Sequence, residues 1–264
     1  MNAKKRPIGF VIAATQHGSM ILNRFDHYQS DVGQWGVGFE LLRDGAFSAN
    51  EVSLCLALLA KRREHFGDGV FALDGGANIG VHSVEWAKAI DGWGKVLAVE
   101  AQERIFYALC GNLAINNCFN AKALHAALGE TEGQIPVPTL DYLSHASFGS
   151  LELKKRSMNE PIGQPVSYTD LNTNMVRLLH IDGMNLDRLD FLKLDVEGME
   201  EEVLRGASAS IGQHRPILLV ERIKSNGQAL EAFFAHHGYR SFMTGMNYLT
   251  IHPSDPSLAS IRKS

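Results

Sequence analysis

The chain has 264 residues, of which 45% are hydrophobic and 20% charged, and its formal net charge is −4. This composition is ordinary for a globular enzyme, and the length suits one large domain with a substantial core. The acidic balance argues against a nucleic-acid partner. Cys55, Cys110 and Cys118 form no CxxC pair, which argues against a disulfide framework or a structural zinc site and favours a reduced, cytoplasmic setting.

The first residues have a weak likeness to a signal peptide. Lys4, Lys5 and Arg6 precede a short apolar run, Ile8 to Ala14. The run ends at Thr15 without a clear cleavage site. No stretch approaches the roughly 18 apolar residues of a membrane span. We therefore expect a cytoplasmic protein without a membrane partner.

Two short strands, at residues 7–14 and 20–25, are predicted to form an N-terminal hairpin. The glycine-rich segment Asp31 to Gly45 predicts a loop. Ser48 to Glu51 then resembles a capping box that begins a helix reaching Glu64. We expect residues 1–47 to precede a main domain that spans residues 48–264.

From Gly69 onward, strands and helices alternate. Strands are predicted at 70–73, 95–99, 121–127, 191–194 and 217–220, helices at 79–90, 103–117, 199–209 and 227–237, and a closing hairpin at 239–243 and 248–252. This alternation predicts an α/β fold, a doubly wound and mostly parallel sheet with helices on both faces.

One segment, residues 129–187, interrupts the alternation. It carries four prolines, Pro136, Pro138, Pro161 and Pro165, among short strand-like pieces. We expect an insertion after the third strand of the sheet, with strands and a helical turn. It would lie over the carboxyl edge of the sheet, where such folds bind ligands.

The strongest motif runs from Asp74 to Gly80 (DGGANIG), between a predicted strand and a predicted helix. Its glycines let the backbone approach a ligand closely. The register does not fit the GxGxxG fingerprint of a dinucleotide site, which holds a pyrophosphate. An acid at the turn suits a ligand with a cationic amino acid portion, as in S-adenosylmethionine.

Glu100 ends the next predicted strand, where a carboxylate can accept hydrogen bonds from both hydroxyls of a ribose. Dinucleotide and S-adenosylmethionine sites both use such an acid, so Glu100 alone does not choose between them. The structural alternative is that Asp74 caps the helix and that Glu100 is a solvated strand end.

A second acidic segment surrounds the strand at 191–194. Asp195 ends this strand, Glu197 lies in the turn that follows, and Glu221 ends the next strand. These carboxylates are expected to meet at the carboxyl edge of the sheet, where Lys193 can keep one of them ionised. They can deprotonate a hydroxyl, hold a divalent cation, or hydrogen-bond loops and ligand. No metal ligand set is predicted.

Together, the segments Asp74–Gly80 and Phe191–Glu200 (FLKLDVEGME) resemble the FkbM-type family of class I S-adenosylmethionine-dependent methyltransferases. The resemblance implies a seven-stranded Rossmann-like sheet and O-methylation of a sugar or natural-product hydroxyl. It implies Asp195 and Glu197 at the reaction centre, with Asp195 the first choice of base. The expected cofactor residues are Asp74, Gly75, Gly76, Asn78, Gly80, Glu100, Ala101 and Ala127.

Three alternatives stay open at this point. One is an NAD(P)-dependent oxidoreductase on a similar sheet, and a second is a non-catalytic module that binds the cofactor. The third is N-methylation, although no tetrapeptide of the Asn-Pro-Pro-Tyr type follows the fourth strand. The first choice is O-methylation of a small hydroxylated molecule.

Overall fold

The computed structural model describes residues 7–31 and 33–260, which divide into two compact units. The basic segment Met1–Arg6 lies outside the described residues. One unit comprises the described part of Met1–Ser48 together with Pro136–Asn174, and the other comprises that of Ala49–Ile135 and Met175–Ser264. The middle of the predicted insertion therefore groups with the N-terminal strands.

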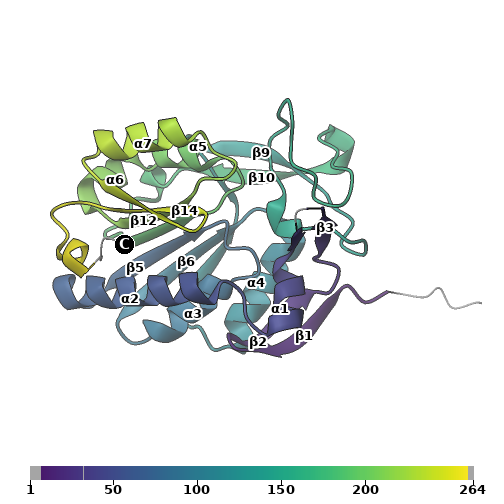
Figure 1. Ribbon diagram of the computed structural model, residues 1–264, viewed down its shortest axis with the longest axis horizontal. Coiled ribbons are helices and arrows are strands. Elements are labelled where there is room, and N and C mark those ends of the chain that lie inside the picture. The colour runs from purple at the N-terminus through teal and green to yellow at the C-terminus, as the bar shows by residue number, and fades with distance from the viewer. Residues whose placement is uncertain (1–6, 32, 261–264) are drawn as a thin grey trace, which may run out of the picture. The chain divides into compact units, whose positions relative to one another are not determined.

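The second unit contains a seven-stranded sheet in the order β13-β14-β12-β11-β5-β6-β7 (Figure 1). Its strands are β5 (Val70–Gly75), β6 (Gly94–Glu100), β7 (Ala121–His125), β11 (Phe191–Leu194), β12 (Ile217–Glu221), β13 (Arg240–Thr244) and β14 (Asn247–Ile251). Five of them are parallel, and β14 and β13 are added antiparallel at one edge. The prediction of a doubly wound, mostly parallel sheet is confirmed.

The central strands are recognisable in the sequence because helices cover both faces of the sheet. All four side chains of β11 are buried, as are the first four of β12. Parallel strands covered on both sides carry continuous apolar runs, without the alternation of a half-exposed strand. The register pairs Lys193 of β11 with Asp74 of β5, so the chain leaves both strands at the same edge.

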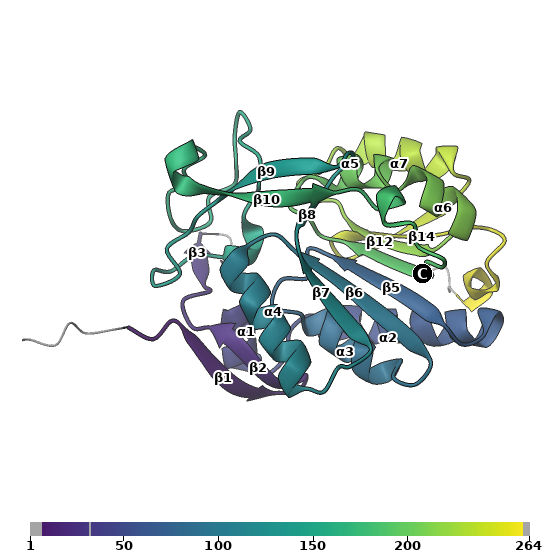
Figure 2. The same ribbon diagram turned by 180° about the vertical axis from the view of Figure 1, so that it is seen from behind.

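Helices cover both faces of this sheet (Figures 1 and 2). The first set of helices is α2 (Ala49–Phe66), α3 (Val81–Ala89) and α4 (Glu103–Ile115), and the second is α5 (Glu200–Arg205), α6 (Ser208–His214) and α7 (Gly227–His236). Leu204, Ile211 and Phe234 of the second set pack into one buried cluster with Leu73 and Leu192 of the sheet. No helix within the described ranges is long and apolar enough to cross a membrane.

The first unit contains the predicted hairpin, in which β1 (Phe10–Thr15) pairs antiparallel with β2 (Gly18–Asn23). Asp26 follows this hairpin and is only 3% exposed. Its carboxylate accepts hydrogen bonds from the backbone N–H groups of Gly38 at 2.8 Å and Phe148 at 2.9 Å. Burial raises its pKa to about 6. Asp26 thus connects the N-terminal residues to the insertion within this unit.

The loop predicted for Asp31–Gly45 is wrong. Strand β4 (Gly33–Trp35) pairs with β3 (Tyr28–Ser30), and helix α1 (Val37–Asp44) follows. Gly36 and Gly45 flank this helix with φ of 140° and 69°. The glycines therefore mark the two ends of a short helix, because each takes a backbone conformation that other residues avoid.

Three smaller predictions also fail. The helix predicted at 199–209 is divided into α5 and α6 around Gly206 and Ala207. The strand predicted at 121–127 ends at His125, and the short β8 (Ala127–Leu128) pairs with β10 instead. The capping box at Ser48 is absent, since the Glu51 carboxylate contacts His82 and Asn247.

The predicted insertion contains two strands, β9 (Gly133–Pro138) and β10 (Thr173–Leu179). With β8 they form a small sheet in the order β8-β10-β9. Three short 3₁₀ turns accompany them: η1 (Phe148–Ser150), η2 (Asp170–Asn172) and η3 (Asp182–Met184). The chain passes between the two units within β9 and again within β10.

Candidate functional site

The bend between β5 and α3 is built around Gly76, whose φ is 76°. A Cβ atom at this position would lie 1.8 Å from the backbone oxygen of Asp195. The N–H groups of Gly76 and Ala77 both donate to the Val99 carbonyl at 3.0 Å. Only glycine fits here, because the backbone of the bend lies directly against the end of β11.

The neighbouring residues of the motif have distinct roles. Gly80 has φ of 89°, and a Cβ there would meet Leu109 at 2.5 Å, so the glycine allows α3 to begin close to α4. Asn78 is left-handed with φ of 51°, and its side-chain oxygen accepts a hydrogen bond from the N–H of Ile79 at 2.7 Å. At Gly75, side chains of Leu128 and Leu194 fill the space that a Cβ would occupy. A larger residue at position 75 would require these two leucine side chains to shift.

Asp74 ends β5 and is 1% exposed. Its Oδ2 accepts a hydrogen bond from Ser83 Oγ in the first turn of α3 at 2.6 Å. Its Oδ1 is buried and has no hydrogen-bond partner in the structure. Asp74 therefore does not cap α3: the Ser83 hydroxyl accounts for one carboxylate oxygen and leaves the other in a buried position, where an unmade hydrogen bond is costly.

Glu100 ends β6 and is 6% exposed, so the alternative of a solvated strand end is wrong. Its two oxygens accept hydrogen bonds from the backbone N–H groups of Gln102 at 2.7 Å and Asn78 at 2.9 Å. Burial raises its pKa to about 7, although these two bonds lower it. A carboxylate has about four accepting positions, so Glu100 can still accept hydrogen bonds from a ligand.

Ala101 directly follows β6, and Ala127 lies two residues after the end of β7. The Ala101 carbonyl is 3.1 Å from His125 Nε2, and the His125 ring stacks on Phe106. Ala126 donates its N–H to the Glu100 carbonyl at 3.1 Å. Ala127 is 3% exposed in β8. These contacts bring the ends of β6 and β7 together beside Glu100.

Lys193 lies on the central strand β11 of the sheet and is paired in register with Asp74 of β5. The residue is 4% exposed, and its Nζ is 3.2 Å from Asp195 Oδ2. Burial alone would lower the pKa of Lys193, but the carboxylates of Asp195, Asp74 and Glu51 outweigh it and raise this pKa. Lys193 is therefore charged, and Asp195, whose side chain is 39% exposed, extends from this ammonium toward solvent.

Glu197 lies in the turn after β11, with φ of 54°. Its Oε2 accepts a hydrogen bond from Lys224 Nζ. Burial raises the pKa of Glu197 to about 8, with Asp195 and Glu200 adding to the shift and Lys224 opposing it. The pKa of Glu197 is therefore higher than that of an ordinary carboxyl group, despite its pairing with Lys224.

Two further glutamates complete this acidic group. Glu200 accepts hydrogen bonds from the N–H groups of Val196 at 2.9 Å and Gly198 at 3.2 Å, so it holds the turn. Glu221 has one buried oxygen without a partner, and burial together with the charges of Asp195, Glu197 and Glu200 raises its pKa to about 9. Across the described part of the chain, no group of His, Cys, Asp and Glu side chains has an arrangement that could hold a metal ion.

Two residues of the site, Ser83 and Lys224, were not predicted from the sequence. Ser83 is the partner of Asp74, and Lys224 is the partner of Glu197. Ser83 lies nine positions after Asp74, where the start of a helix at Val81 would have indicated it. Lys224 follows β12 at the same sheet edge as Glu197, and that shared edge was the available signal.

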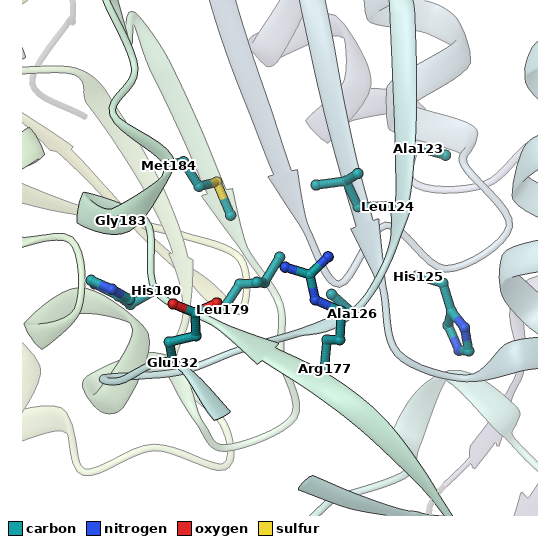
Figure 3. A pocket seen from close by; sticks show the side chains of 10 residues that line it. All are labelled: Ala123, Leu124, His125, Ala126, Glu132, Arg177, Leu179, His180, Gly183 and Met184. Atoms are coloured by element: carbon teal, nitrogen blue, oxygen red, sulfur yellow. The ribbon is translucent and has the colours of Figure 1, made fainter. Parts of the chain in front are cut away.

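A pocket of about 360 Å³ opens beside β7 in the second unit, next to this site. Figure 3 shows Leu124, Met184 and Arg177 directed into it from β7, η3 and β10. Its lining includes Ala126 but none of the residues predicted to hold the cofactor. We therefore distinguish this pocket from the site at the bend.

The arrangement favours a particular kind of ligand. A glycine bend allows close backbone approach, and buried carboxylates with accepting capacity surround it. Buried carboxylates are stabilised by a nearby cation or by hydrogen-bond donors. The site therefore suits a positively charged molecule with hydroxyl groups.

Comparison with known proteins points to one family. Residues 74–248 match the family described as the methyltransferase FkbM domain. The matched region begins at Asp74 and ends in β14, so it includes the bend, both acidic segments and most of the sheet.

Three individual proteins that resemble this chain are 30% identical to it or less over the aligned residues. The chain is similar to methyltransferase sdnD of Sordaria araneosa, with 30% identity over 64% of this chain and 73% of that protein. It is 28% identical to methyltransferase 1 of Beauveria bassiana, over 53% of this chain and 59% of that protein. A crystal structure of methyltransferase FkbM from Methylobacillus flagellatus aligns with a TM-score of 0.49 and 17% identity, over 70% of this chain and 44% of that one. The chain thus spans only about half of the latter two proteins.

Proposed function

Because the chain belongs to the FkbM methyltransferase family, we propose that it binds S-adenosylmethionine at the bend between β5 and α3 and methylates a hydroxyl oxygen. The acceptor is a small hydroxylated molecule, such as a sugar or a natural product. We place this activity in the cytoplasm, without a membrane or nucleic-acid partner.

The observation that carries the proposal is the unpartnered Oδ1 of Asp74, buried at the end of β5. A ligand with a positive charge would supply the missing partner. S-adenosylmethionine carries a sulfonium and an ammonium, so its charge fits the acidic surroundings of the bend. Gly76 supports the same assignment, since its bare backbone leaves room for close approach of a ligand.

Glu100 would hold the other end of the cofactor. Its carboxylate retains accepting positions beyond the bonds from Gln102 and Asn78. Two ribose hydroxyls can donate to it, and the backbone around Ala101 and Ala127 borders the place expected for the adenine. Gly75, Asn78 and Gly80 would act through the shape of the bend and not by side-chain contact.

When bound, S-adenosylmethionine supplies a methyl group activated by the positive charge of the sulfonium. The chain's own contribution is mainly to position the acceptor oxygen in line with that methyl group. Holding two reactants in this way can lower a barrier by about 7–11 kcal/mol.

The second contribution is removal of the acceptor's proton. Asp195 is the better base, because its carboxylate is partly exposed at the end of β11 and is paired with the charged Lys193. Glu197 is the second choice, since its carboxylate is already paired with Lys224 and is less exposed than that of Asp195. A positioned base contributes about 10²–10⁴-fold to such a step.

Calorimetric titration with S-adenosylmethionine tests the cofactor site. We expect the wild-type chain to bind, and Asp74→Ala and Glu100→Ala each to lose at least about tenfold in affinity, because each removes a charged hydrogen-bond acceptor. Asp91→Ala, an exposed acid after α3, is the control and should bind as wild type does. Unchanged affinity in both site variants would contradict the proposal.

The reaction itself is tested with a panel of small alcohols, sugars and matched amines. We expect mass spectrometry to detect methyl ethers formed from hydroxylated members of the panel. Asp195→Asn should bind the cofactor more weakly, because it removes one negative charge from the site, and at saturating cofactor it should still lose at least about 10²-fold in rate. Methylation of the amines alone would contradict O-methylation while leaving the family assignment intact.

A further inference from the structure

A buried group of charges around Lys193 includes a residue that precedes the matched family region. Glu51 lies in the first turn of α2, whereas the match begins at Asp74. The Glu51 side chain is 24% exposed and approaches the sheet from the α2–α3 face. Glu51 takes no part in the proposed methyl transfer.

The side chains of His82 and Asn247 contact the Glu51 carboxylate from two different elements. His82 Nε2 of α3 lies 3.0 Å from its Oε1. Asn247 of β14 donates its Nδ2–H to Oε2 at 2.7 Å. The carboxylate is thus fixed from both sides.

The third neighbour is Lys193. Burial alone would raise the pKa of Glu51, yet contact with His82 and the charge of Lys193 lower it. The same Lys193 Nζ lies 3.2 Å from Asp195 Oδ2, Lys193 is paired in register with Asp74 on the neighbouring strand, and its charge interacts with both carboxylates. One buried ammonium is therefore shared among three carboxylates, two of which belong to the proposed cofactor and reaction sites.

We propose that Glu51 is a positioning residue that shares the charge of Lys193, so that Asp74 and Asp195 keep enough negative charge to bind a sulfonium. The inference rests on the proposed function. Without Glu51, Lys193 would compensate Asp74 and Asp195 alone, and the site would present less negative charge to a cation. Interactions between charges persist over several ångströms in a poorly solvated site.

A pair of ligands that differ by one charge separates this role from a structural one. S-adenosylmethionine carries the sulfonium, and S-adenosylhomocysteine is the neutral thioether that remains after methyl transfer. Calorimetry gives the Kd of each ligand for wild type, Glu51→Gln, Glu51→Asp and the control Glu64→Gln, an exposed glutamate of the same helix. Thermal melting of each variant establishes that it is folded.

We expect Glu51→Gln, which keeps the shape but removes the charge, to weaken the binding of S-adenosylmethionine about three- to tenfold more than the binding of S-adenosylhomocysteine. The ratio of the two affinities, S-adenosylmethionine over S-adenosylhomocysteine, should therefore fall by that factor. Glu51→Asp keeps the charge and should fall between wild type and Glu51→Gln in this ratio. Glu64→Gln should leave the ratio unchanged. If Glu51→Gln does not fold, the ratio for Glu51→Asp must still lie below that of wild type.

Two results would overturn the inference, and they are distinguishable. If wild type binds both ligands but Glu51→Gln weakens them equally or not at all, Glu51 is only a structural residue and the proposed function stands. If wild type binds neither ligand, the proposed function fails and this inference fails with it.

Discussion

Acidic residues at the ends of neighbouring strands differ in what they do because their hydrogen-bond partners differ. Asp74 and Glu100 are both buried. Asp74 has one oxygen without a partner, whereas both oxygens of Glu100 accept backbone N–H groups. Glu100 therefore shapes the bend through Asn78 even before any ligand is considered, and Asp74 depends more on one.

The raised pKa of Glu100 makes the stability of the fold depend on pH. Its pKa is about 7 in the folded chain, against an ordinary value of 4.5. Between these values the folded chain binds more protons than the unfolded chain, so the stabilising contribution is complete below about pH 4.5 and is lost as the pH rises through 7. We expect wild type to lose up to about 3 kcal/mol relative to Glu100→Gln between pH 5 and 8.

Urea unfolding of both proteins at a series of pH values measures this difference. Loss of one backbone hydrogen bond in Glu100→Gln shifts its curve by a constant amount, so the slope carries the information. Glu103→Gln, a half-buried acid in the first turn of α4, is the control and should run parallel to wild type. Parallel curves for wild type and Glu100→Gln would contradict the assigned pKa.

The site residues could be predicted from the sequence where a single strand end determines their place. Asp74, Glu100 and Asp195 follow apolar runs that helices cover on both faces, and parallel strands bring such ends to one edge. Glu51 was interpreted as part of a capping box because it lies three residues after Ser48. In the structure its carboxylate contacts Asn247, which is 196 positions away. No local pattern reveals a contact of that kind.

At the level of elements, the bend between β5 and α3 depends on the short distance between the ends of the neighbouring strands β5 and β11. Its backbone meets Asp195 at Gly76, so the geometry of β11 dictates the residue in the β5 loop. The apolar runs of these strands were predictable. The glycine-flanked α1 and the break between α5 and α6 were not, since glycine in one sequence can end a helix as well as form a loop.

Two glycines with nearly the same φ separate the effect of backbone strain from that of close packing. Gly76 has φ of 76° and a backbone oxygen 1.8 Å from its Cβ position, whereas Gly92 has φ of 77° and nothing within 4 Å. Gly92→Ala should lose about 1–2 kcal/mol from left-handed strain alone. Gly76→Ala should lose about 2 kcal/mol more, because the methyl group forces β11 to move.

Urea unfolding gives both free energies, and calorimetry adds a second comparison. Gly76→Ala should also lose S-adenosylmethionine binding, while Gly92→Ala should retain it. Equal losses of stability in the two variants would mean that the bend can open without strain, contrary to the packing described here.

At the scale of the whole molecule, an ion network joins segments on both sides of the matched family region. Arg62 of α2 bonds to Asp190 at 3.0 Å and to Asp255 at 2.6 Å, and all three side chains are nearly inaccessible to solvent. Asp190 immediately precedes β11, and Asp255 lies just before η4 (Pro256–Ser260). The sequence did not predict this network, because its members are up to 193 positions apart.

Neighbouring arginines of α2 provide a matched test of this network. Arg62→Met should lose about 3 kcal/mol of unfolding free energy, because it leaves Asp255 without its arginine partner and Asp190 with only Arg188. Arg63→Met breaks an exposed pair with Asp68 and should lose less than about 1 kcal/mol. Thermal or urea unfolding compares them, and similar losses would show that the buried network contributes no more than a surface pair.

The base of the insertion has a consequence for how this chain can change. Its two arms leave on adjacent strands, β9 and β10, and Thr139 donates its N–H to the Asn172 carbonyl at 2.8 Å where they part. Because this hydrogen bond and the pairing of β9 with β10 hold the two ends of the segment together, residues 140–171 can be exchanged for a longer or shorter loop without disturbing that strand pairing. The replacement must also keep the backbone contacts that this segment makes with the N-terminal residues, namely the Phe148 N–H to Asp26, the Ala146 N–H to the Phe25 carbonyl, and the Ala146 carbonyl to the His27 N–H. Diversity can accumulate there while the glycine bend stays fixed.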